Sequence, residues 1–217
     1  MLFVKCPEPG LVKTRLATQL SDEFVANLYS CFIKDILNTL DNAELSHRIH
    51  VHHPEGNADC PELEYTQRPL YEQVGRDLGE RMRRAFLDAF RHEYKSVIII
   101  GSDLPDIPVE YIREGFRALQ VKDCVIGPAS DGGYYLLGFN VDTFVPEVFE
   151  DIPWSTDEVF NKTISILQSK SCNIHLLPEL QDIDTLNDLK NFIHRNKDNS
   201  PETSHTLSFI AEQQILF

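Results

Sequence analysis

The sequence lacks any apolar run close to the ~20 residues that a membrane-spanning helix needs. Its first ten residues, MLFVKCPEPG, also lack the long apolar region of a secretory signal peptide, so we expect a cytoplasmic protein with no membrane span. Basic residues are scarce, because 20 Lys and Arg face 34 Asp and Glu and leave a formal net charge of −14. The resulting field repels phosphate backbones, which argues against nucleic acid as a partner but permits a small anionic ligand in a local basic pocket.

Cysteine and histidine give no pattern typical of a metal site. The cysteines form no CxxC pair, their number is odd and their spacing is wide: Cys6, Cys31, Cys60, Cys124 and Cys172. This pattern fits neither a zinc site nor a disulfide framework, so the sequence predicts reduced thiols. His50 and His52 share a face of an expected edge strand, where exposed histidines are favoured over metal ligands.

What the sequence does contain is an alternation of short apolar stretches and helical patterns. With 217 residues, of which 42% are apolar, the chain has enough material for a hydrophobic core. We expect strands at residues 2–5, 47–53, 96–101, 123–127, 134–139 and 173–177, with helices between them. This order predicts an α/β protein with three α/β/α layers and a mainly parallel central sheet.

A polar segment at 196–205, NKDNSPETSH, is the one break in composition along the chain. We therefore expect one domain at residues 1–195, followed at 196–217 by a polar linker and a short C-terminal tail. Apolar residues between 207 and 215 recur at the spacing of a short helix. This helix docks either on the domain or on a second subunit, and the sequence leaves a homodimer open.

The first candidate site follows the first expected strand. Lys5, Lys13 and Arg15 lie within eleven residues of each other in an acidic chain. A loop that leads into a helix offers free N–H groups and a positive dipole end, which suit phosphate, and Lys13 and Arg15 add charge-assisted hydrogen bonds. The glycine spacing of a Walker loop is absent. The alternative is a solvated basic start of a helix, with Arg15 in a surface ion pair.

Carboxylates follow two later strands. Asp103 comes directly after the apolar stretch 96–101, where a carboxylate in the cleft can bind a divalent cation. Alternatively, Asp103 or Ser102 caps the next helix. Asp131 precedes two glycines and can contact a substrate hydroxyl or amine, although an Asp-Gly pair is also a common signal of a tight hairpin turn.

The last candidates lie near the end of the domain. Thr185 and Asp188 have the spacing of a capping box for a final helix, which leaves Asp182 and Asp184 without a structural explanation. Trp154 either lines a pocket or fills the core.

Six segments occur together and in a fixed order: PEPGLVKTRL, QVGRDLGERM, GSDLP, GPASDGGYYLLG, IPWST and DIDTLNDL. In these segments the chain resembles a bacterial family described as glycosyltransferases, also known as domain of unknown function 2064 or radical-SAM/selenodomain-associated transferase. The family belongs to the nucleotide-diphospho-sugar transferase superfamily with the GT-A fold. The resemblance covers about residues 1–195.

The resemblance implies roles for matched positions in this sequence. It implies a nucleotide-binding set of Lys5, Pro9, Gly10, Lys13, Arg15, Gln73, Asp77, Gly79, Arg81 and Ser102. It implies a substrate-facing set of Asp131, Gly132, Gly133, Tyr134, Trp154 and Thr156. It implies Asp103 and Asp184 as ligands of Mg²⁺ or Mn²⁺, with Asp103, Lys13 and Arg15 as the catalytic residues. Lys13 and Arg15 would stabilise the charge that develops on a leaving pyrophosphate or nucleoside diphosphate.

Three functions follow as hypotheses. The first is a metal-dependent glycosyltransferase that uses a nucleotide-diphospho-sugar donor and an unknown small-molecule acceptor, although the DxD motif of that class is absent after residue 101. The second is a nucleotidyltransferase that joins a nucleoside triphosphate to a phosphorylated small molecule and releases pyrophosphate. The third is a non-catalytic nucleotide-binding protein, because a fold alone does not guarantee catalysis.

Overall fold

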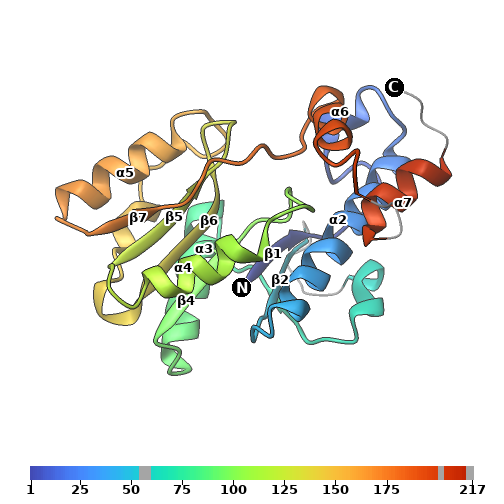
Figure 1. Cartoon of the computed structure of the whole chain (residues 1–217). Coiled ribbons are helices and arrows are strands. Elements are labelled where there is room, and N and C mark those ends of the chain that lie inside the picture. The colour runs from blue at the N-terminus through green and yellow to red at the C-terminus, as the bar shows by residue number, and fades with distance from the viewer. Residues whose placement is uncertain (54–59, 200–202, 214–217) are drawn as a thin grey trace.

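Seven strands form one sheet in the part of the chain that the structure describes, which is residues 1–53, 60–199 and 203–213 of a computed structural model. The strands are β1 Leu2–Lys5, β2 Ile49–His52, β3 Leu70–Glu72, β4 Ser96–Ile100, β5 Cys124–Pro128, β6 Tyr134–Asn140 and β7 Ile174–Leu176. Their order across the sheet is β3-β2-β1-β4-β6-β5-β7 (Figure 1). Only β6 runs antiparallel to its neighbours among these strands, so the expected mainly parallel sheet is confirmed.

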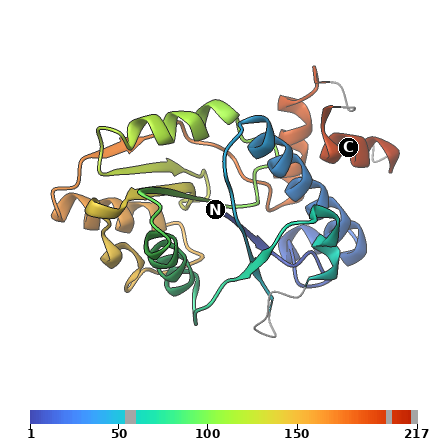
Figure 2. The same cartoon turned by 90° about the horizontal axis from the view of Figure 1, so that it is seen from below.

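Helices cover both faces of the sheet and complete the expected three layers. They are α1 Thr14–Ala17, α2 Asp22–Asn42, α3 Leu78–Arg91, α4 Val109–Ala118, α5 Val159–Ser169, α6 Leu186–Arg195 and α7 His205–Glu212. One hydrophobic cluster joins α2, α4 and α6 to one face of the sheet, and a second joins α3 and α5 to the other. Figure 2 shows α4 and α3 on opposite sides of the strands. No helix within the described residues is long and apolar enough to cross a membrane.

The apolar sequence of β4 explains why helices pack on both sides. Successive side chains of a strand point to opposite faces of the sheet. Ile98 and Ile100 accordingly belong to the cluster with α2 and α4, whereas Val97 and Ile99 belong to the cluster with α3 and α5. All four are at most 5% exposed, as expected for a strand at the centre of a parallel sheet.

The expectation that all cysteines are reduced thiols is wrong for one pair. Cys6 and Cys60 form a disulfide, with their Cα atoms 5.7 Å apart. Strands β1 and β2 are parallel neighbours, so the chain leaving β1 at Cys6 lies close to the chain that follows β2. This proximity depends on strand pairing and therefore leaves no trace in cysteine spacing. Cys31, Cys124 and Cys172 are free.

The expected position of the histidines on an exposed edge strand is also wrong. The strand β3, only three residues long, covers the outer side of β2 and forms the edge itself. His50 is therefore 4% exposed, and its ring stacks between Phe3 and Tyr71, with both ring centroids 5.4 Å away.

The C-terminal helix α7 docks on the chain's own helix α2, which answers the question that the sequence left open. Phe24 of α2 and Phe209 of α7 place their rings 5.1 Å apart. The buried carboxylate of Asp35 accepts hydrogen bonds from the N–H groups of His205 and Thr206, at 2.7 and 2.9 Å. The parts of the expected linker and tail at 200–202 and 214–217 lie outside the described residues.

Candidate functional site

A cavity of about 870 Å³ opens at the carboxyl ends of the parallel strands. Lys5 ends β1, His52 ends β2, Asp103 follows β4 and Asp131 follows β5, and all four residues line this cavity. The carboxyl edge is where open α/β sheets bind their ligands, because loops and helix starts converge there. The strand order thus gathers segments far apart in the sequence around one space.

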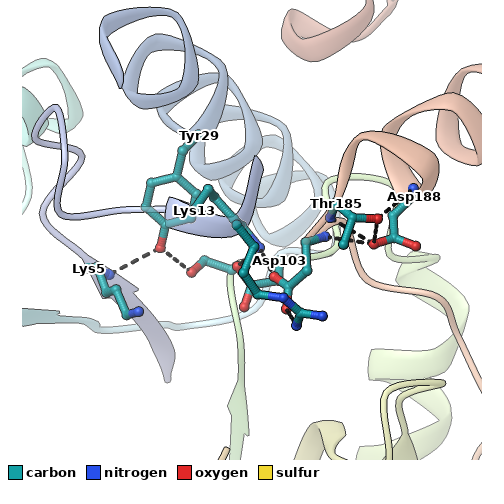
Figure 3. A network of polar contacts seen from close by, with 9 residues as sticks. Lys5, Lys13, Tyr29, Asp103, Thr185 and Asp188 are labelled. Carbon is teal, nitrogen blue, oxygen red and sulfur yellow. Dashed lines mark hydrogen bonds and ion pairs between the residues drawn. The ribbon is translucent and has the colours of Figure 1, made fainter. Parts of the chain in front are cut away.

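Lys13 is buried at one end of the cavity between two carboxylates. Its Nζ lies 2.5 Å from Oδ1 of Asp103 and 2.9 Å from Oδ1 of Asp184 (Figure 3). The Lys13 side chain is 6% exposed. Burial alone would lower the pKa of Lys13, but the charges of Asp103 and Asp184 outweigh burial and hold that pKa above its usual range. Lys13 is therefore a permanently charged link between the two residues that the resemblance implied as metal ligands.

Asp184 lies on an extended segment that crosses the molecule from β7 to α6, drawn in orange in Figure 1. This segment is fastened beside the cavity, because the N–H of Ile183 donates to the carbonyl of Asp103 at 3.1 Å. Nη1 of Arg15 lies 3.3 Å from Oδ2 of Asp184. Burial would raise the pKa of Asp184, but Lys13 and then Arg15 hold it below its usual value, so the carboxylate stays ionised.

The expected capping box at the start of α6 is confirmed, and it also fixes the backbone of Asp184. Oγ1 of Thr185 accepts from the N–H of Asp188, and Oδ2 of Asp188 accepts from the N–H of Thr185 at 2.8 Å (Figure 3). The same Oδ2 accepts from the N–H of Asp184 at 3.3 Å. The helix start therefore contributes to the position of the Asp184 carboxylate.

A cluster of acidic side chains occupies the same end of the cavity. Carboxylate oxygens of Asp131, Asp182 and Asp184 all lie within 4.8 Å of one another. Burial, and next the negative charges of Asp131 and Asp184, raise the pKa of Asp182 to about 7. Together with Asp103 this end of the cavity has four carboxylates, whereas Lys13 and Arg15 are the two basic side chains that pair with them. Their oxygens are the hard ligands that Mg²⁺ and Mn²⁺ prefer, and the excess of negative charge suits a divalent cation.

The floor of the cavity contains a buried tyrosine that the sequence analysis did not single out. The hydroxyl of Tyr29 lies 2.5 Å from Oγ of Ser102 and accepts from the N–H of Lys5 at 3.1 Å (Figure 3). Burial, and next the charge of Asp103, raise the pKa of Tyr29 to about 12, so its hydroxyl stays neutral. Tyr29 thus links Lys5 at the end of β1 to Ser102, the residue before Asp103. These hydrogen bonds help to fix Asp103 relative to β1.

Gly79 makes room for the ring of Trp154, which lines the cavity. A Cβ on Gly79 would lie 2.5 Å from the carbonyl oxygen of Phe149 and 2.6 Å from the ring of Trp154, so only glycine permits this contact. Trp154 lines the cavity and also packs against the hydrophobic cluster that contains α3 and α5. Asp77 caps α3, because its Oδ1 accepts from the N–H of Glu80 at 2.8 Å.

Gly132 has a comparable role in the β5–β6 hairpin. Its φ is 88°, and a Cβ there would lie 2.3 Å from the carbonyl oxygen of Asp157. Oδ1 of Asp131 accepts from the N–H of Gly133 at 2.8 Å. The turn interpretation of this Asp-Gly segment is thus correct, and the same turn also carries Asp131 to the acidic cluster.

The structure brings most of the predicted site residues to one space. Those that line the cavity are Lys5, Lys13, Arg15, Gln73, Arg81, Ser102, Asp103, Asp131, Gly133, Tyr134, Trp154, Thr156 and Asp184. Those that do not line it are Pro9, Gly10, Asp77, Gly79 and Gly132. Several further residues that line the cavity were not predicted as site residues, among them Tyr29, His52, Met82 and Asp157. His52 could have been identified as a polar residue at the end of an expected strand. No local sequence pattern distinguishes the other three.

Comparisons with known proteins identify the family and the fold of the chain. A model of the family described as uncharacterized proteins conserved in bacteria (DUF2064) matches residues 36–156. A solved structure from Desulfovibrio desulfuricans G20, provisionally described as a nucleotide-diphospho-sugar transferase, is 39% identical to this chain. It aligns with 98% of this chain and 93% of its own, with a TM-score of 0.89.

Two other matches are more distant. The 2-phospho-L-lactate guanylyltransferase of Methanocaldococcus jannaschii is 31% identical over 126 residues, or 58% of this chain. The match spans about half of that relative, 53% of its length. The 4-diphosphocytidyl-2C-methyl-D-erythritol synthase of Anaerococcus prevotii DSM 20548 has a TM-score of 0.57 at 11% identity, over 90% of this chain and 97% of that one. The expected fold of nucleotide-diphospho-sugar transferases is confirmed.

Proposed function

The chain belongs to the bacterial family DUF2064, and from this premise we propose that it is a nucleotidyltransferase. It would join the nucleoside monophosphate part of a nucleoside triphosphate to a phosphorylated small molecule and release pyrophosphate. The fold of nucleotidyl and nucleotide-sugar transferases and the guanylyltransferase relative support this class of reaction. The activity of that relative belongs to a longer protein, so its substrate is not transferred to this chain.

One observation carries the proposal. Lys13, buried at the start of α1, lies between Asp103 after β4 and Asp184 before α6, and Arg15 lies beside Asp184. Three separate segments therefore place two cations and two carboxylates at one end of a cavity. Phosphoryl transfer depends mainly on positioning and on stabilising negative charge, and this arrangement offers both.

A divalent cation is part of the proposal. The acidic end has more carboxylates than basic side chains, so a triphosphate would meet net repulsion there unless a cation accompanied it. Asp103 and Asp184 would hold Mg²⁺ or Mn²⁺, with Asp131 and Asp182 close by. When bound, such an ion supplies Lewis-acid stabilisation of phosphate oxygens.

The side chains of the protein would position the carboxylates and bind the phosphates of the nucleotide. Lys13 stays charged and holds Asp103 and Asp184 at a fixed separation, while Arg15, 68% exposed, can turn towards the phosphates of a bound nucleotide. An acceptor phosphate is already an anion and needs no general base. The function of the protein would then be to orient the acceptor against the α-phosphate and to stabilise the departing pyrophosphate.

Glycosyl transfer from a nucleotide-diphospho-sugar is the second candidate. The provisional description of the Desulfovibrio desulfuricans structure favours it. The sequence after β4, Gly101-Ser-Asp-Leu-Pro105, contains no DxD motif, and the second carboxylate comes from the distant Asp184 instead. We therefore place nucleotidyl transfer first.

A thermal-shift panel separates the candidates. Nucleoside triphosphates, nucleoside diphosphates and nucleotide-diphospho-sugars are each added with and without Mg²⁺ or Mn²⁺. A ligand at ~100 times its Kd should stabilise the fold by ~2.7 kcal/mol, and we expect the largest metal-dependent shift from a triphosphate. A larger shift from a nucleotide-diphospho-sugar would favour glycosyl transfer, and no shift from any nucleotide would contradict both.

Two variants test where the nucleotide binds. Arg15→Gln should weaken the binding of the triphosphate by about 10-fold or more, because hydrogen bonds to charged groups contribute about 1.5–3 kcal/mol. Lys162→Gln is the matched control, since Lys162 is an exposed basic residue on α5 outside the cavity. Equal affinities in the two variants would exclude Arg15 from the site.

A further inference from the structure

The cavity also has a basic end, at the ends of β1 and β2. Lys5 and His52 are direct register partners in the last rung of β1 and β2. Along each strand, every second residue points to the same face of the sheet. The rung of Phe3 and His50 faces α3, so the rung of Lys5 and His52, two residues later, faces α3 as well.

Arg81 lies in the first turn of α3, on the face of the sheet towards which this rung points. Arg81, Lys5 and His52 all line the cavity. Burial, and next the positive charges of Arg81, Lys5 and His53, lower the pKa of His52. Gln73 borders the same corner but is already engaged, since its Nε2 donates to the carbonyls of Val4 and His50.

The basic groups of this corner have no carboxylate partner in the part of the chain that the structure describes. No ion pair joins Lys5, His52 or Arg81 to an acidic residue there. Nε of Arg81 is buried and makes no hydrogen bond to any described residue. Asp77 caps α3 and makes no ion pair with Arg81; burial lowers the pKa of Arg81, and the charge of Asp77 only partly offsets this.

These absences are informative because the chain is acidic. With 34 acidic against 20 basic residues, a partner for a buried guanidinium N–H is easy to supply. Nε of Arg83 on the same helix is also buried without a hydrogen bond to any described residue, but Arg83 does not line the cavity. Arg76 and Arg84 both pair with Glu80. A buried guanidinium N–H without an acceptor is costly, and phosphate and carboxylate are the groups that match its planar fork.

We propose that Lys5, His52 and Arg81 form a second anion subsite, which binds a phosphate or carboxylate group of the acceptor. This assignment replaces the nucleotide-binding role that the resemblance implies for Lys5 and Arg81. This inference rests on the proposed function and refines its substrate class. Adjacent strands lie ~4.8 Å apart, so the end of β2 at His52 is about 10 Å from the end of β4 before Asp103, with Lys5 on the strand between them. The acceptor would then be a small molecule with two anionic groups: a phosphate that attacks at the acidic end, and a second anion held at the basic end.

The test uses inorganic phosphate as the probe on the full chain. The protein is first saturated with an α,β-methylene triphosphate analogue and Mg²⁺, which occupies the acidic end, and phosphate is then titrated while the melting temperature is recorded. We compare the wild type with Arg81→Gln and with Arg84→Gln, the matched control on the outer face of the same helix.

We expect phosphate to stabilise the wild type and Arg84→Gln at similar concentrations, whereas Arg81→Gln should need at least 10-fold more phosphate. Arg81→Lys, which keeps the charge without the planar fork, should lie between them and serves if Arg81→Gln does not fold. Equal responses in Arg81→Gln and Arg84→Gln would overturn the subsite.

Binding of the triphosphate analogue shows whether the basic corner takes its anion from the nucleotide or from the acceptor. If Arg81→Gln weakens the analogue 10-fold and phosphate no longer stabilises the saturated wild type, the corner binds the nucleotide and the assignment to the acceptor is wrong. If the wild type does not bind the analogue, the proposed function fails. In that case the phosphate titration of nucleotide-free protein still decides the subsite, through the same pair of variants.

Discussion

The two ends of the cavity differ in how their charges are satisfied. At the acidic end, Lys13 is 6% exposed and contacts both Asp103 and Asp184. At the basic end, Arg81 has a buried Nε with no partner among the described residues. The ion pairs of Lys13 stabilise the fold without a ligand, whereas Nε of Arg81 has a hydrogen bond left to donate to a ligand. The comparison indicates that removing Lys13 should damage the structure and that removing Arg81 should damage binding.

The largest expected effect comes from breaking the acidic end. Lys13→Met leaves Asp103 and Asp184 without their shared cation. Because these carboxylates are 48% and 30% exposed and Asp184 keeps Arg15, the loss should be about 3 kcal/mol, at the lower end of the range for a buried ion pair. We expect the free energy of unfolding, measured by denaturant titration, to fall by that order. Lys13→Met combined with Asp184→Asn should recover part of the stability but none of the activity. A single variant as stable as the wild type would show that the pair does not hold the site together.

The disulfide beside the basic end gives the next effect. Cys6 directly follows Lys5 and closes a loop of 54 residues to Cys60. Removing such a link destabilises by roughly 2–4 kcal/mol, mainly because the unfolded chain gains freedom. We expect Cys60→Ser to show this loss in non-reducing denaturation, and the wild type to show it when reductant is added. Cys172→Ser, at a free and partly exposed cysteine, is the control and should change little.

His50, one rung behind the basic end, gives a pH-dependent effect. Burial, and next neighbouring positive charges that include Arg48, lower the pKa of His50 to about 4 from 6.5. The unfolded chain therefore binds more protons than the folded one between these values, and stability falls as the pH falls from 6.5 towards 4. The loss should approach ~3 kcal/mol at pH 4. In His50→Phe, which keeps a ring between Phe3 and Tyr71, the unfolding free energy should vary less over this range; an unchanged pH profile would contradict the burial argument.

The smallest expected effect concerns the segment that presents Asp184. Thr185→Ala removes the side-chain cap of α6, which contributes about 1 kcal/mol at such positions. Denaturant titration should show this loss. Ser21→Ala, which removes the cap of α2 away from the cavity, should cost a similar amount of stability. Only Thr185→Ala should also weaken metal-dependent nucleotide binding. Equal nucleotide affinity in both variants would show that the cap of α6 does not position Asp184 for binding.

Local patterns in the sequence were enough to predict the layers of the fold and most of the strands. The apolar stretch of β4 and the capping residues Thr185 and Asp188 act over a few neighbouring residues, so their signals can be read directly. The carboxyl-edge rule then placed Lys13, Asp103 and Asp131 around one cavity. Which roles these residues have in catalysis stays a prediction.

Features created by strand order could not be predicted in this way. The disulfide exists because β1 and β2 are neighbours, and His50 is buried because the short strand β3 covers β2. The contact of Tyr29 with Ser102 joins residues 73 positions apart. No window of sequence contains both partners of such contacts, so the sequence suggested free thiols and exposed histidines.

The most direct measurement is pyrophosphate release from a panel of nucleoside triphosphates with Mg²⁺ and mixed phosphorylated acceptors, compared between the wild type, Asp103→Asn and Asp142→Asn. Asp142 is an exposed residue outside the cavity and serves as the matched control. Our account predicts metal-dependent release by the wild type and Asp142→Asn, and a loss of about 100-fold or more in Asp103→Asn, as for other groups that stabilise transition-state charge. Release that is unchanged in Asp103→Asn, or nucleoside diphosphate released from a nucleotide-diphospho-sugar instead, would contradict it.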